Sequence, residues 1–135
     1  KALKGNNIMT ELNIADNLME KDGAMDIAKT IPTMGAISVV NILSNNIGTE
    51  QANKLVKIME SKDDLKTLCS FSGNETELDL SSKGLRAGCA VLVANEVKNN
   101  GALTSLNLAS NILHAEGAKH VAEAIKGHVS ALRFV

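Results

Sequence analysis

Two cysteines and three histidines are the side chains best suited to covalent or metal chemistry in this sequence. Cys69 and Cys89 are too few to form the disulfide framework of a small secreted domain. We expect both to be reduced thiols, which indicates an intracellular, cytoplasmic protein. Cys89 precedes a predicted helix, where a thiolate would be favoured, and Cys69 could be a reactive thiol on a strand. Ordinary packing is the preferred interpretation of both.

The histidines His114, His120 and His128 give no clear catalytic or metal site. His120 follows Glu116 by four residues, so both side chains share one helix face and could form a weak metal pair; the preferred interpretation is two solvated polar residues. Gly-rich phosphate loops, Cys-x-x-Cys and His-Glu-x-x-His are absent from the sequence. We therefore predict no catalytic residue, no cofactor and no metal, and a protein that is not an enzyme.

The charged residues nearly balance, with 15 acidic and 14 basic side chains. This balance argues against a nucleic-acid partner, which usually requires a basic excess. Glu75, Glu77 and Asp79 form a small acidic group that would either meet a basic partner or be the solvated edge of a loop. Lys54 and Lys57 are interpreted as a solvent face. Since no apolar run approaches about 20 residues, we expect no membrane insertion.

The elements that would position these residues follow an internal repeat. Four short apolar cores begin at Leu12, Val40, Leu78 and Leu106, and the first and last pairs are both 28 positions apart. A step of 28 from Val40 reaches Leu68, where a third unit begins and then begins again at Leu78. Because a unit of this length cannot bury its own apolar face, the units must stack.

An asparagine stands five residues after three of the four cores, at Asn17, Asn45 and Asn111. Its amide can both donate to and accept from backbone groups of the bend that follows each strand, which would otherwise be buried without partners. Lys83 occupies this position in the third unit and cannot do both, so we expect that unit to be locally irregular.

The second half of each unit carries one helical register, with a small apolar residue first and a larger one three later. The four sets are Ala24, Ile27, Ala28 and Ile31; Ala52, Leu55, Val56 and Met59; Ala90, Val93, Ala94 and Val97; and Ala118, Val121, Ala122 and Ile125.

The run Leu103-x-x-Leu106-x-Leu108-x-x-Asn111-x-Leu113, followed by Gly117 and Ala118, resembles the leucine-rich repeat. The 28-residue period with a full helix is similar to the ribonuclease-inhibitor-like subfamily, which is typically intracellular. The resemblance implies an α/β leucine-rich-repeat solenoid, an arc with parallel strands on the concave side and helices on the convex side, of about four to five repeats.

We expect a single leucine-rich-repeat domain over residues 1–135, a fragment of a longer solenoid, so that targeting segments could lie outside this sequence. The predicted repeats span residues 6–33, 34–61, 62–100 with an insertion at about 69–78, 101–129, and the start of another at 130–135.

In this architecture, strand residues between the leucine positions would point to the concave side and bind a protein partner. The predicted partner-binding residues are Glu11, Asn13, Val39, Asn41, Leu43, Glu77, Asp79, Ser105 and Asn107. A second candidate site is the insertion at residues 71–76, where an exposed Phe71 would be an anchor.

The sequence thus favours a non-catalytic protein–protein interaction module or scaffold. One alternative is a structural or accessory subunit of a larger complex, held by its helix side or its open ends. Another is a regulator of a small GTPase, for which Arg86 and Arg133 are the only arginines.

Overall fold

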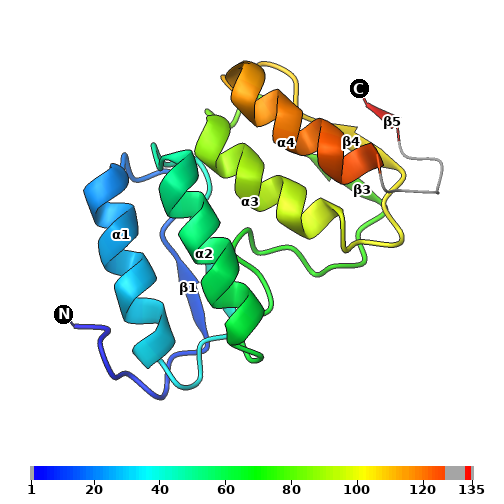
Figure 1. Ribbon diagram of the computed structural model, residues 1–135. Helices are drawn as coiled ribbons and strands as arrows, with labels where there is room; N and C mark the ends of the chain where they lie inside the picture. Colours follow the sequence, from blue (N-terminus) through cyan, green and yellow to red (C-terminus); the bar gives the residue numbers. More distant parts are fainter. Residues whose placement is uncertain (1, 127–132, 135) are drawn as a thin grey trace.

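Strands and helices alternate along the chain in the computed structural model, which describes residues 2–126 and 133–134. In order they are β1 (Glu11–Asn13), α1 (Lys21–Thr30), the short 3₁₀ helix η1 (Ile31–Thr33), β2 (Val39–Asn41), α2 (Thr49–Ser61), β3 (Glu77–Asp79), α3 (Ala87–Val97), β4 (Ser105–Asn107), α4 (His114–Lys126) and β5 (Arg133–Phe134). The α-helices lie side by side in one layer, with the strands behind them (Figure 1).

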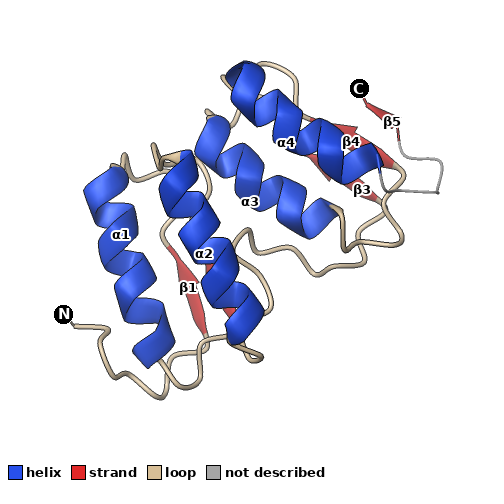
Figure 2. Ribbon diagram, viewed as in Figure 1, coloured by secondary structure: helices blue, strands red, loops and turns tan. Residues whose placement is uncertain are grey.

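The strands form two separate parallel sheets in the described part of the chain, one of β1 and β2 and the other of β3, β4 and β5 (Figure 2). In the first sheet Leu12 pairs with Val40, and in the second Leu78 pairs with Leu106. Both pairs are 28 residues apart, so the sequence period sets the register within each sheet. β5 then pairs in parallel with β4.

The first sheet ends in an irregular segment instead of continuing to β3. Thr67 and Cys69 form isolated bridges with Val39 and Asn41, the first parallel and the second antiparallel. The backbone N–H of Val40 donates to the Thr67 carbonyl, and that of Ile42 donates to Leu68. β3 takes its place beside β4, and no pairing joins it to β2 among the described residues.

The expectation of a leucine-rich-repeat solenoid with four to five repeats in one arc is therefore wrong. Two short parallel sheets stand where one continuous sheet was expected, and the chain forms a small α/β domain. Val40 and Leu78 are not paired neighbours, because the segment at residues 67–69 occupies the edge of β2. The sequence was misleading because the third unit begins twice, at Leu68 and again at Leu78. The segment at Leu68 is the irregular edge of the first sheet, and the segment at Leu78 is β3.

The helices bury different faces because they have different neighbours. α3 is buried over most of its length, including Cys89, Leu92 and Val93, because α2 and α4 both pack against it. α4 buries Gly117, Val121 and Ala124 but exposes Ala118 and Ala122. Of the apolar positions predicted for the fourth unit, Ala118 and Ala122 therefore do not face the core, because only one side of α4 is covered by another described helix.

The start of α3 lies close to the backbone of the segment before α2. Gly88 is buried, and a Cβ atom there would collide with the carbonyl oxygen of Ile47, just before α2. Only glycine allows α3 to lie this close to the end of the first sheet.

We expect Gly88→Ala to lower the free energy of unfolding by about 2 kcal/mol, because overpacking must displace backbone. Gly101→Ala is the matched control, since a Cβ there has no neighbour within 4 Å. Urea unfolding measures both variants, and equal stability of the two would contradict the close approach.

Candidate functional site

A hollow of about 660 Å³ lies where the carboxyl ends of the strands meet the break between the sheets, and we call it the inter-sheet hollow. Its lining comes from both halves of the chain: Ala15, Asp16, Asn41, Leu43, Ser44, Cys69, Phe71, Leu80, Ser82, Lys83, Gly84 and Leu85. Ligands of parallel α/β folds commonly bind outside the carboxyl ends of strands, where the strand order is interrupted.

Asn45 fixes the first wall of the hollow. Its buried amide donates to the carbonyls of Ile14, Ile42 and Leu43 at 3.0–3.3 Å. Its Oδ1 accepts from the backbone N–H groups of Asn17 and Met19. One side chain therefore holds its own bend and the bend of the preceding strand, which include Ala15 and Ser44.

Asn111 performs the same function for the second wall. Its amide donates to the carbonyls of Leu80 and Leu108, and its Oδ1 accepts from the N–H groups of Lys83 and Leu85 at 3.0 Å. Lys83 lacks the amide of the asparagine position, but its backbone N–H donates to Asn111 just as the N–H of Asn17 donates to Asn45. Asn17, at the outer end of the first sheet, donates only to Ile14 and Ala15 within its own bend.

Glu96 of α3 closes the edge of the first sheet. Its carboxylate accepts from the Thr67 hydroxyl at 2.6 Å and from the Leu68 N–H at 2.7 Å. Burial raises the pKa of Glu96 more than these two hydrogen bonds lower it. Through these hydrogen bonds the carboxylate holds the edge of the first sheet next to Cys69, which lines the hollow.

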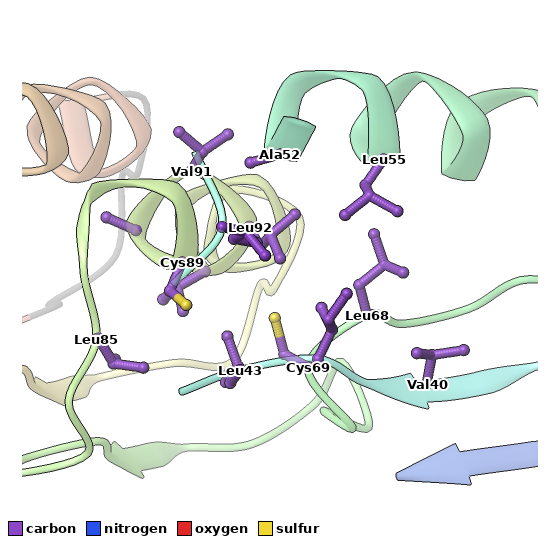
Figure 3. Close-up of a cluster of buried hydrophobic side chains, with 14 of the residues drawn as sticks. Val40, Leu43, Ala52, Leu55, Leu68, Cys69, Leu85, Cys89, Val91 and Leu92 are labelled. Carbon is purple, nitrogen blue, oxygen red and sulfur yellow. The ribbon is translucent and has the colours of Figure 1, made fainter. Parts of the chain in front are cut away.

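The two cysteines lie within the packed core that forms the floor of the hollow, near Leu43, Leu85 and Leu92 (Figure 3). Both are free and buried, and the Cys89 thiol lies 3.5 Å from the Asn45 carbonyl oxygen. Burial, with a smaller contribution from Glu96, raises the pKa of Cys69 well above its ordinary value. The Cys69 sulfur is therefore a protonated thiol, which is unsuited to nucleophilic chemistry.

Four of the predicted partner-binding residues also have a structural role that sequence reasoning missed. Asn13, Asn41, Asp79 and Asn107 each accept, through Oδ1, the backbone N–H two residues later at 3.0–3.1 Å. Hydrogen bonds from Ser81 lower the pKa of Asp79. An Asn or Asp at the last residue of each of the strands β1 to β4 was the signal that could have identified these turns.

The other predicted partner-binding residues divide by their surroundings. Glu11 and Glu77 are exposed, and Val39 and Ser105 are half-buried beside them on the neighbouring strands. The expectation that Leu43 is exposed on this face is wrong, because only 6% of its surface is accessible. β2 ends at Asn41 and the chain turns, so the alternation of a strand no longer places residue 43 on the outer side.

The insertion at residues 71–76 contributes one side chain, that of Phe71, to the lining of the hollow. Phe71 is half-buried against the core and lines the hollow, so it is not the exposed anchor that was considered. Glu75 accepts from the N–H groups of Ser72 and Gly73. Partial burial raises its pKa, but these hydrogen bonds together lower it below its ordinary value. Glu75 therefore stabilises its own loop.

Polar residues of the hollow were missed by sequence reasoning. Asp16, Ser44 and Ser82 line it, and all three have a φ between 54° and 60°. Each follows its strand by three residues, a regularity that the apolar pattern does not reveal.

The histidines form no visible site within the described ranges. His114 is exposed and His120 is half-buried, and no group of three metal-ligating side chains occurs among the residues that the structure places. His128 lies outside the described residues.

Comparison with models of known protein families and with curated proteins finds no match for this chain. In the part of the chain that the structure describes, every helix is too short or too polar to cross a membrane.

We expect Asn45→Ala to lower the free energy of unfolding by about 3 kcal/mol, because the five hydrogen bonds between its side chain and the backbone are lost. Its neighbour Asn46 is the control, since it is exposed and its side chain donates only to the Glu20 carboxylate at 3.3 Å. Thermal and urea unfolding should show Asn46→Ala within about 0.5 kcal/mol of the parent. Equal losses in the two variants would show that Asn45 does not hold the bends.

Removal of the Glu96 carboxylate should likewise cost about 2 kcal/mol, because the Leu68 N–H and Thr67 hydroxyl lose their acceptor. Glu123→Ala, on the exposed face of α4, is the control. Because the pKa of Glu96 is raised on folding, the carboxyl stabilises the fold most at pH values below its ordinary pKa of 4.5, and this contribution falls as pH rises through the folded pKa. The loss in Glu96→Ala should therefore be larger in acid than at neutral pH, and the opposite trend would contradict the buried carboxyl.

Proposed function

We propose that this protein is a non-catalytic protein–protein interaction module that receives an extended segment of a partner protein in the inter-sheet hollow. The hollow itself is the observation that carries the proposal. It is lined by side chains from both sheets, and rigid hydrogen-bonded bends surround it. Its floor is apolar through Leu43, Leu80 and Leu85, and its rim is polar, as in most binding sites for organic side chains.

The exposed acidic side chains of the strands favour a basic partner segment. Glu11, Glu77 and Asp79 are exposed on strands that lead to the hollow but lie outside its lining, and Asp16 lines it. Lys83 is the one basic side chain that lines the hollow. Complementary charge steers association and fixes register, so a segment with lysine or arginine flanking an apolar residue fits best.

The buried thiols support a reducing compartment for this module. Cys69 and Cys89 are both reduced and enclosed in the core. An intracellular, cytoplasmic location is therefore part of the proposal.

Binding of synthetic peptides of equal length, one basic, one neutral and one acidic, tests this proposal by calorimetric titration. Ala15→Trp fills the hollow, and Ala109→Trp is the matched control. The two alanines have equivalent positions: the Ala15 N–H donates to Asn13 Oδ1 at 3.1 Å, and the Ala109 N–H donates to Asn107 Oδ1 at 3.0 Å. Only Ala15 lines the hollow. We expect the basic peptide to bind best and to lose about tenfold or more in affinity with Ala15→Trp alone. Preference for the acidic peptide, or equal losses in both variants, would refute the proposal.

A further inference from the structure

A second hollow, of about 360 Å³, lies between the outer faces of α1 and α2, and we call it the α1–α2 groove. It is lined by Met25, Ala28, Lys29, Lys54, Lys57 and Ile58. The two helices run side by side in the helix layer, which is away from the strands (Figure 2). The groove therefore shares no residue with the inter-sheet hollow.

The floor of the groove is apolar. Ala28 is buried, and Met25 and Ile58 are half-buried with their remaining surface turned to solvent. Alanine keeps the floor deep because it has no side chain beyond Cβ. Methionine is flexible and polarisable, so it adapts to the shape of an apolar side chain that enters from outside.

The rim of the groove is basic on both sides. Lys29 comes from α1, and Lys54 and Lys57 come from α2, and all three are exposed. Within the described residues, none of these three lysine side chains has a hydrogen bond or an ion pair. Their ammonium groups are therefore available to an external anion.

Carboxylates of the same helices lie near the three lysines in sequence but outside the lining of the groove. Asp26 precedes Lys29 by three residues, Glu50 precedes Lys54 by four, and Glu60 follows Lys57 by three. Such spacings allow only weak solvent-exposed attraction. No acidic residue of the described chain belongs to the lining of the groove.

From this combination we propose that the α1–α2 groove docks an acidic amphipathic helix of a partner protein. An apolar side of the helix would lie on Met25, Ala28 and Ile58, and flanking Asp or Glu side chains would pair with the three lysines. A helix suits a groove between two helices because its side chains at i, i+3 and i+4 form one narrow apolar row. From the sequence alone, Lys54 and Lys57 were expected to be a plain solvent face. In the structure they share the groove with Lys29 of α1.

The opposite charges of the two surfaces separate their partners. The strands beside the inter-sheet hollow present Glu11, Glu77 and Asp79, whereas the α1–α2 groove presents lysines. A basic segment that enters the hollow would be repelled by the groove. The two sites would therefore bind different segments, and each can be lost without the other.

Fluorescence anisotropy with a labelled synthetic peptide of Glu, Ala and Leu tests the groove, with the leucines on one helical face. A peptide of the same composition, with leucines distributed around the helix, is the ligand control. Lys54→Glu combined with Lys57→Glu reverses the rim, and Lys119→Glu combined with Lys126→Glu makes the same charge change on exposed lysines of α4.

We expect the amphipathic peptide to bind, and the Lys54/Lys57 variant to lose about tenfold or more in affinity while the Lys119/Lys126 variant keeps most of it. Circular dichroism confirms that both variants remain folded. Equal binding of the two peptides, equal losses in the two variants, or no binding would each overturn the proposal. Binding to phosphatidylserine vesicles without binding to the peptide would also overturn it, in favour of a membrane surface.

Discussion

The structure depends on the hydrogen bonds that the Glu96 carboxylate accepts at the edge of the first sheet. The Thr67 hydroxyl and the Leu68 backbone N–H donate to this carboxylate at 2.6 and 2.7 Å, so the Leu68 N–H is not offered to a further strand. β3 then pairs only with β4, and a second sheet begins. Glu96 belongs to α3, which follows β3 in the sequence, so the helix of the second half completes the first half. Gly88 and Cys89, at the other end of α3, contact the segment before α2 and hold the two halves together.

The inter-sheet hollow is a consequence of this arrangement. Two sheets that stop short of each other leave their carboxyl-end bends facing a common space, and Asn45 and Asn111 make each bend rigid. Rigidity lowers the entropy that a binding partner must lose through ordering of the site. The helix layer keeps a separate basic groove between α1 and α2. The exposed acidic residues of the strands and the lysines of the groove therefore lie on different elements.

The sequence predicted local structure well and long-range continuity poorly. The 28-residue spacing gave the correct pairing of Leu12 with Val40 and of Leu78 with Leu106, because register within a sheet follows directly from a regular period. It could not show that Glu96 would satisfy the donors of Thr67 and Leu68, since that contact joins residues 28 and 29 positions apart through side chains with no recurring pattern. Leu43 was placed on the outer face by strand alternation, but β2 ends two residues earlier. The hollow arises from the break between the sheets, so its polar lining could not be predicted from a continuous repeat.

The most direct test of the two-sheet arrangement is a set of nuclear Overhauser contacts between backbone protons in an isotopically labelled sample. Strong contacts are expected between Val39 and Thr67 and between Leu78 and Leu106, with slow exchange of the Leu68 amide proton. No contact is expected between the backbones of Val40 and Leu78. Direct pairing of Val40 with Leu78 would show that the strands form one continuous sheet, and the inter-sheet hollow would not exist.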